Sequence, residues 1–209
     1  KADKGQNCIL GLGTGISLTP IYDELARRHY ECGLSFRNVI VFNAYEYYPL
    51  TPDAAHSSIT QLRERLLSRV NINPNNVFTP DGTIAQDKVQ AYCRQYEQRI
   101  KGMGGIDIML LGIGRLGNIA TNEPGSALSS TSRIILLDHT SREEMTMSFG
   151  SETPVPPCSI TMGIQTILQA RKIFLTAWGE SKADIICRAI EGQMTDALPA
   201  SFLQSHQNV

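Results

Sequence analysis

The chain has 209 residues, of which 42% are hydrophobic, and its 19 basic and 20 acidic side chains leave a formal net charge of -1. A chain of this length and composition can bury a sizeable core, and its balanced charge argues against general affinity for nucleic acid or an anionic membrane. No apolar run approaches the length of a membrane span, and no secretory signal is visible after the first residue, Lys1. We therefore expect a cytoplasmic globular protein.

The cysteines and histidines do not suggest a metal site. The five cysteines are odd in number and widely spaced without a C-x-x-C motif, and the four histidines show no ligand spacing. Disulfide frameworks and zinc sites depend on such patterns. We therefore expect reduced thiols and no bound metal.

Short apolar runs alternate with segments of helical periodicity along the chain. The pattern predicts strands at 8–13, 39–43, 106–114, 133–137, 159–163 and 173–179, and helices at 20–30, 84–101, 164–172 and 181–192. Continuous apolar strands that alternate with helices are typical of a mainly parallel sheet covered on both faces. The sequence therefore predicts an α/β fold of this kind.

Four polar or glycine-rich segments follow strands of the predicted sheet, at 13–17, 43–50, 112–124 and 178–182. In parallel sheets, ligands bind beyond the carboxyl ends of the strands. We therefore expect these four segments to converge on one pocket.

Two of these segments carry groups suited to phosphate. In GTGIS at 13–17, backbone N–H groups and the hydroxyls of Thr14 and Ser17 are placed to hold an anion at a helix start. A plain glycine turn is the alternative, and the segment lacks a Walker lysine. Lys182, in the first turn of the predicted helix 181–192, would neutralise a phosphate or, alternatively, lie in solvent.

The other two segments carry carboxylates. Glu46 lies among three tyrosines in NAYEYYPL and is either a functional carboxylate or a cap for the segment that follows. Glu123 precedes Pro124, which restricts the Glu123 backbone to extended conformations. That restriction suits a carboxylate that orients another group, and a structural turn is the alternative.

These motifs, taken in order, resemble the glucosamine-6-phosphate deaminase (isomerase) family over nearly the whole chain. The resemblance rests on LGLGTGISLTPIYDEL, NVIVFNAYEYYPL, GNIATNEPGSALSSTSR and VPPCSITMGIQTILQARKIFLTAWGESKADI. It implies a modified doubly wound α/β fold and a hydrolase that converts glucosamine 6-phosphate into fructose 6-phosphate and ammonia. It also implies a small-molecule sugar phosphate as the partner, no cofactor, and a homo-oligomer.

The family domain has a helix before the first strand and a further strand after the segment that corresponds to LQSH at 203–206. The resemblance therefore implies that residues 1–209 are a single domain cropped at both ends. It places the phosphate on Thr14, Gly15, Ser17 and Lys182, together with an arginine for which Arg142 is the candidate.

The resemblance also shows departures at the catalytic positions. The family motif Gly-x-Gly-x-Asp-Gly-His-Ile-Ala-Phe-Asn-Glu-Pro corresponds to residues 112–124, where Leu116 replaces the aspartate and Asn118 replaces the histidine that helps open the sugar ring. Tyr45 replaces the aspartate that moves a proton from C2 to C1, whereas Glu46 and Glu123 are retained. Asparagine does not exchange a proton at neutral pH, and a tyrosine of ordinary pKa is a poor base.

The sequence therefore predicts a family member that binds a sugar phosphate, has weak or absent deaminase activity, and serves in sensing, regulation or assembly. The alternative is an active divergent deaminase or aldose–ketose isomerase in which Glu46, Glu123, Tyr45 or His56 supplies the proton transfer. A related lactonase branch fits less well, because its signature also carries the histidine that Asn118 replaces.

Overall fold

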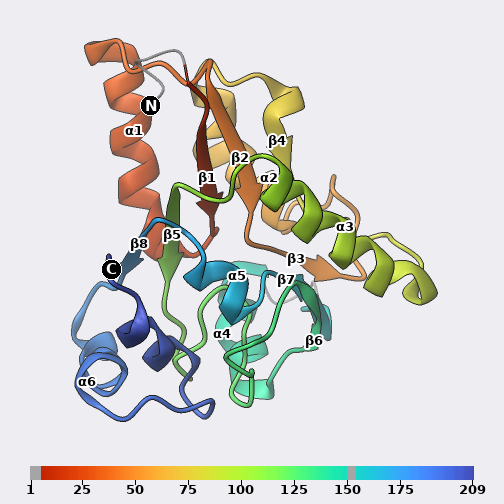
Figure 1. Cartoon of the computed structure of the whole chain (residues 1–209), viewed down its shortest axis with the longest axis vertical. Coiled ribbons are helices and arrows are strands. Elements are labelled where there is room, and N and C mark those ends of the chain that lie inside the picture. The colour runs from red at the N-terminus through yellow and green to blue at the C-terminus, as the bar shows by residue number, and fades with distance from the viewer. Residues whose placement is uncertain (1–5, 150–153) are drawn as a thin grey trace.

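Five parallel strands form the main sheet in the order β4-β2-β1-β5-β8. The structure is a computed structural model that describes residues 6–149 and 154–209 (Figure 1). The strands are β1 (Cys8–Leu12), β2 (Val39–Asn43), β4 (Val77–Phe78), β5 (Ile108–Gly112) and β8 (Lys172–Thr176). Because β1 lies at the centre and pairs with both β2 and β5, the chain winds outward from it in two directions.

Helices cover both faces of this sheet because successive strand residues alternate between the faces. Leu10, Leu12 and Val41 pack with residues of α1 (Thr19–Cys32) and α2 (Ser58–Arg65). Ile9, Phe42 and Met109 pack with residues of α3 (Val89–Gly102) and α5 (Ile164–Leu168). The predicted α/β fold, with a mainly parallel sheet between two helical layers, is confirmed.

A second sheet of three antiparallel strands was not predicted. It has the order β3-β7-β6 and consists of β3 (Tyr45–Tyr48), β6 (Arg133–Leu136) and β7 (Cys158–Thr161). The predicted strands 133–137 and 159–163 thus pair with each other rather than with the main sheet, and the expected loop 43–50 contains β3. Short apolar runs have the same periodicity in either kind of sheet, so the sequence pattern does not distinguish them.

Helix boundaries also differ from the prediction. Helices α2 and α4 (His139–Phe149) were not predicted, and a short 3-10 turn precedes α3, which begins only at Val89. The predicted helix 164–172 ends at Leu168, because Lys172 already pairs with Ile108 in β8. The predicted helix 181–192 corresponds to a 3-10 turn at Glu180–Lys182 followed by α6 (Ala183–Glu191).

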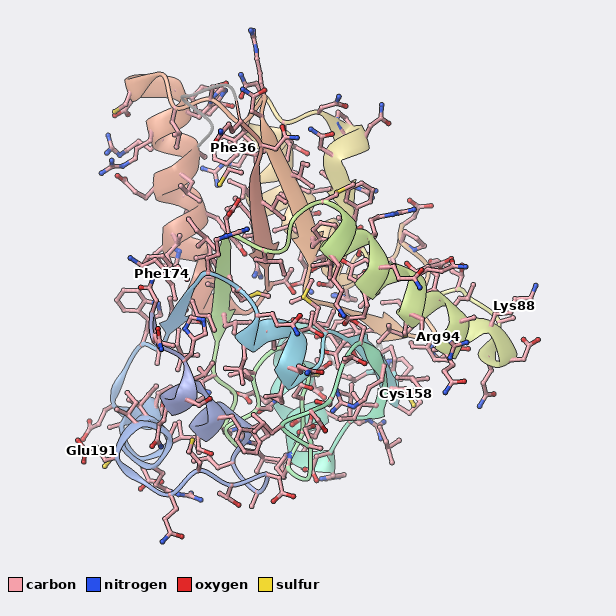
Figure 2. All side chains as sticks on the ribbon, in the orientation of Figure 1. Phe36, Lys88, Arg94, Cys158, Phe174 and Glu191 are labelled. Atoms are coloured by element: carbon pink, nitrogen blue, oxygen red, sulfur yellow. The ribbon has the colours of Figure 1, made fainter. Side chains whose placement is uncertain are left out.

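The small sheet lies beyond the carboxyl ends of the parallel strands, beside α4 (Figure 1). The Met162 N–H donates to the Ala44 carbonyl over 2.8 Å, which connects the end of β7 to the junction of β2 and β3. At the other side of the main sheet, β8 is the edge strand, and Phe174 projects outward from it (Figure 2). Within residues 6–149 and 154–209, no helix is long and apolar enough to cross a membrane.

Candidate functional site

A cavity of about 470 Å³ lies where β1, β5 and β8 end. Each of the four predicted segments contributes to its lining, which includes Thr14, Gly15, Ser17, Tyr45, Gly112, Gly114, Asn118, Trp178 and Lys182. The expected convergence of the four strand exits on one pocket is therefore confirmed. The parallel topology explains it, because the strands β1, β5 and β8 all end at the same edge of the sheet.

Thr14 and Tyr45 form one wall of the cavity. The Thr14 hydroxyl lies 2.7 Å from the Tyr45 phenol oxygen and 3.1 Å from the Ser58 hydroxyl. Burial raises the pKa of Tyr45, an effect that its hydrogen bond with Thr14 offsets in part. Tyr45 is therefore a neutral phenol at neutral pH, able to hydrogen-bond a ligand but poorly suited to remove a proton.

Ser17 and Lys182 belong to the opposite wall, next to β8. The Ser17 hydroxyl accepts from Thr176 over 3.2 Å, and its carbonyl accepts from the Trp178 indole over 2.7 Å. The Lys182 ammonium lies 3.0 Å from Glu144 Oε1, and its side chain is 20% exposed. Lys182 is thus a partly buried cation held at the cavity by an acidic partner.

The loop after β5 brings Asn118 close to the backbone of Gly114. A Cβ atom at Gly114 would lie 1.9 Å from Asn118 Oδ1, so this approach requires glycine. Asn118 Oδ1 is buried without a hydrogen-bond partner among the described residues. Since a buried acceptor without a partner is costly, a ligand hydroxyl at this point would be favourable.

The same loop holds Ala120, which lines the cavity, at a φ of 49°. A left-handed backbone is unfavourable for a residue with a Cβ atom and persists only where its surroundings fix it. Asn122 does so by donating to the carbonyls of Ile119 and Met162, over 3.0 and 2.8 Å, while its own oxygen accepts from Arg133. Asn122 therefore holds the loop in its bent shape.

The two carboxylates predicted as site residues do not line the cavity. Glu46 is buried and accepts from the N–H groups of Ser58 and Ile59 over 2.7 and 3.0 Å, so it caps the start of α2. Burial raises the pKa of Glu46, and these N–H groups oppose the rise. Of the two interpretations that the sequence left open for Glu46, the geometry favours the cap.

Glu123 is buried below the loop rather than open to the cavity. Its Oε2 accepts from the Ser141 hydroxyl over 2.9 Å, and its Oε1 has no partner among the described residues. Burial raises the pKa of Glu123, and the nearby Asp138 and Glu144 raise it further.

Three further predicted residues also lie outside the cavity lining. Leu116 is half-buried and does not reach it. Arg142 donates to the Val155 carbonyl over 3.4 Å and is not among the lining residues. The ring of His56 stacks on Phe149 with the centroids 4.8 Å apart. The structure thus does not bring Leu116, Arg142 or His56 together with Thr14, Ser17 and Lys182.

Sequence reasoning missed the lining residues on two helices. Gln61 and Arg65 come from α2, and Glu144 and Met145 come from α4. Neither helix was predicted. A serine before a helix is a start signal that can be recognised in a sequence, and in the structure Ser57 caps α2 by accepting from the Thr60 N–H. Arg65 Nη1 donates to the Thr14 carbonyl over 2.5 Å, which brings a second cation to the cavity.

A larger hollow of about 700 Å³ lies between β8, α6 and the C-terminal residues, where it is lined mainly by apolar side chains. We assign the functional site to the smaller cavity, because the polar and charged groups converge there. In the part of the chain that the structure describes, no group of three or more His, Cys, Asp or Glu residues is placed to hold a metal ion.

The fold and this cavity define the class of protein. The chain belongs to the family of glucosamine-6-phosphate isomerases and 6-phosphogluconolactonases, whose family model matches residues 2–209. The resemblance expected from the sequence motifs is therefore confirmed.

In sequence identity, the chain is nearer to the deaminases than to the lactonases of this family. It is 58% identical over 208 residues to a putative glucosamine-6-phosphate deaminase-like protein of Bacteroides thetaiotaomicron, a match that covers 100% of this chain and 31% of that protein. It is also 41% identical over 201 residues to a glucosamine-6-phosphate deaminase of Geobacillus sp., covering 96% of this chain and 79% of the relative. The chain thus spans less than a third of the first relative's length.

Solved structures agree with this placement. A monomeric glucosamine-6-phosphate deaminase superposes with a TM-score of 0.93 at 37% identity, covering 97% of this chain and 83% of that one. A 6-phosphogluconolactonase from Thermotoga maritima superposes with a TM-score of 0.73 at 19% identity, covering 96% and 82%, which supports the fold alone.

Proposed function

We propose that the cavity binds a sugar phosphate and that the protein deaminates amino sugars weakly or not at all. The phosphate would lie between the backbone of residues 15–17 and the ammonium of Lys182. One observation carries the proposal: Tyr45 and Asn118 line the cavity, where deamination needs a base and a ring-opening acid.

Neither side chain suits the chemistry. Moving a proton from C2 to C1 of the sugar needs a group that is ionised at neutral pH, and burial raises the pKa of Tyr45. Opening the ring needs a group that exchanges protons, which an asparagine amide does not. One positioned acid or base contributes about 10²–10⁴ in rate, so losing both would leave little turnover.

Phosphate binding does not depend on these lost groups. It uses backbone N–H groups, the Thr14 and Ser17 hydroxyls and the charge of Lys182, which all belong to the cavity lining. Binding without turnover suits a sensing, regulatory or assembly role. We place the protein in the cytoplasm, as expected from its composition, and in a homo-oligomer, as the family resemblance implies.

An active divergent enzyme is the second candidate. Of the substitutes expected from the sequence, Glu46, Glu123 and His56 lie outside the cavity lining, whereas Tyr45 is within it. Glu144 is the one carboxylate residue among the described lining residues, and it is paired with Lys182. An active enzyme would therefore have to use Tyr45 or Glu144 for proton transfer.

The proposal is tested by restoring the family groups together, as Tyr45→Asp, Leu116→Asp and Asn118→His. Ammonia release from glucosamine 6-phosphate should rise above the wild-type rate, and each single change should do less because ring opening and proton transfer are successive steps. The melting temperature of each variant checks that it folds. A folded triple variant that binds glucosamine 6-phosphate and releases no more ammonia than wild type would contradict the proposal.

A further inference from the structure

We propose that the phosphate of the ligand carries an aromatic substituent, which lies on the indole of Trp178 at the mouth of the cavity. The ligand class is then a sugar phosphodiester that bears an aromatic group, in place of a simple phosphate monoester. This inference rests on the proposed function, because it takes the phosphate to lie between residues 15–17 and Lys182. It adds the chemical class of the group on the outer side of that phosphate.

Trp178 is exposed but held in place. It lines the cavity and is 61% exposed, and its indole N–H donates to the Ser17 carbonyl over 2.7 Å. Single exposed apolar residues are ordinary on protein surfaces and need no ligand to explain them. A fixed indole at the mouth of a cavity differs from these, because a ligand that covers it buries a large apolar area at little cost in side-chain freedom. The indole is therefore a preformed platform for a flat apolar group.

Ile16 adds a second apolar side chain to the same part of the cavity. It is 81% exposed, it also lines the cavity, and it precedes Ser17, whose carbonyl holds the indole. Ile16 has no polar side-chain atom, and the indole N–H of Trp178 is already donated to Ser17. Neither side chain therefore suits phosphate oxygens, and their place beside the expected phosphate segment favours an apolar group of the ligand.

The burial of the lining residues gives the order of the ligand groups from the interior to the mouth. Tyr45 and Asn118 are 8% and 5% exposed, and the buried Oδ1 of Asn118 lacks a partner among the described residues. Such polar groups suit the hydroxyls of a sugar at the closed end. The Lys182 side chain is 20% exposed, whereas Ile16 and Trp178 are open to solvent. A sugar inside and a phosphate at Lys182 would direct a substituent of that phosphate toward the indole.

Titration with three probes tests this assignment. The probes are glucosamine 6-phosphate and two of its phosphodiesters, in which a methyl or a phenyl group is esterified to the phosphate. The two diesters carry the same charge and differ in the aromatic ring. Calorimetry measures the affinities, and the fluorescence of Trp178, the one tryptophan of the sequence, reports contact with the ring.

Wild type should bind the phenyl diester about fivefold or more tightly than either other probe, the effect of stacking one planar group on an aromatic side chain. The phenyl diester should also change the indole emission more than the methyl diester does. Trp178→Ala should abolish the preference for phenyl over methyl, and Trp178→Phe should retain part of it. Phe174→Ala is the matched control, because Phe174 is an exposed aromatic residue outside the described cavity lining, and it should leave the preference unchanged.

Two results would overturn this inference and leave the proposed function standing. One is that wild type binds glucosamine 6-phosphate but binds the phenyl diester no more tightly than the methyl diester or the monoester. The other is that a folded Trp178→Ala variant keeps the full preference for the phenyl diester. If folded wild type binds none of the three probes, the proposed function and this inference are both overturned.

Discussion

At the scale of single residues, the proposed function assigns to Lys182 the cation that binds the phosphate. Replacing it by alanine removes the cation and leaves Glu144 without the partner that it has at 3.0 Å. We expect Lys182→Ala to weaken the binding of glucosamine 6-phosphate by about 1.5–3 kcal/mol, the range for a hydrogen bond to a charged group. Isothermal titration calorimetry measures the change.

The matched control for Lys182 is Lys172, which lies on the exposed side of β8 with its ammonium 5.0 Å from the centre of the Phe174 ring. Lys172→Ala removes the same charge outside the cavity and should leave the affinity unchanged. Equal affinities of wild type and Lys182→Ala would show that Lys182 is not a phosphate ligand.

Glu123 makes stability depend on pH in a defined direction. Burial raises its pKa in the folded protein, so over the interval between its unfolded and folded pKa values the folded state binds more protons than the unfolded state. Stability then falls as pH rises through that interval. Glu123→Gln is neutral and can still accept from Ser141, so its stability relative to wild type should increase from about pH 4 to neutral pH.

Urea denaturation of both proteins over this pH range measures the difference in free energy of unfolding. Glu143→Gln, which replaces an exposed carboxylate of α4, is the control and should differ from wild type by an amount that changes little with pH. A difference between Glu123→Gln and wild type that shrinks as pH rises would show that Glu123 is stabilised as a carboxylate.

At the scale of elements, helix α2 connects Glu46, which follows β2, to the cavity. Glu46 caps the N–H groups of Ser58 and Ile59 at the start of α2, and Arg65 is the last residue of this helix. A glutamine at position 46 accepts fewer hydrogen bonds and turns its amide donor toward the helix. We expect Glu46→Gln to lower the free energy of unfolding at pH 7 by about 1–3 kcal/mol.

The destabilisation caused by removing the neighbouring Ser57 cap is a reference for the destabilisation expected in Glu46→Gln. Ser57→Ala removes the hydroxyl that accepts from the Thr60 N–H and should cost about 0.5–2 kcal/mol. Guanidinium denaturation measures the free energy of unfolding of both variants and of wild type. If Glu46→Gln is as stable as wild type but abolishes sugar-phosphate binding, Glu46 is a ligand group rather than a cap.

The elements also show how far periodicity predicts this protein. Strand 39–43 was predicted with its observed bounds, because all five side chains of β2 are buried and the first four form a continuous apolar run. Helix α2 was missed because only Ser58, Ile59 and Leu62 of its eight residues are buried, which leaves a weak pattern. That omission removed Arg65 and Gln61 from the predicted site. The four strand exits were found from their composition and from their position after predicted strands.

At the scale of the whole molecule, the topology brings together groups that are far apart in the sequence. Thr14, Tyr45, Asn118 and Lys182 meet because β1, β5 and β8 run parallel and β2 continues into β3. The sequence predicted this convergence because ligands bind beyond the carboxyl ends of the strands in a parallel sheet. It did not predict the antiparallel pairing of β3, β6 and β7, because pairing partners depend on contacts between distant segments rather than on local periodicity.

At this scale, the central claim is that the chain binds a sugar phosphate and catalyses little deamination. The turnover number of the wild-type chain tests this claim most directly. Ammonia release from saturating glucosamine 6-phosphate should be far below the range of ordinary enzymes, about 1–10³ per second, because Tyr45 and Asn118 line the cavity where a base and a ring-opening acid are needed. A turnover number within that range would contradict the account, and Glu144 and Tyr45 would then be the first residues to replace in search of the base.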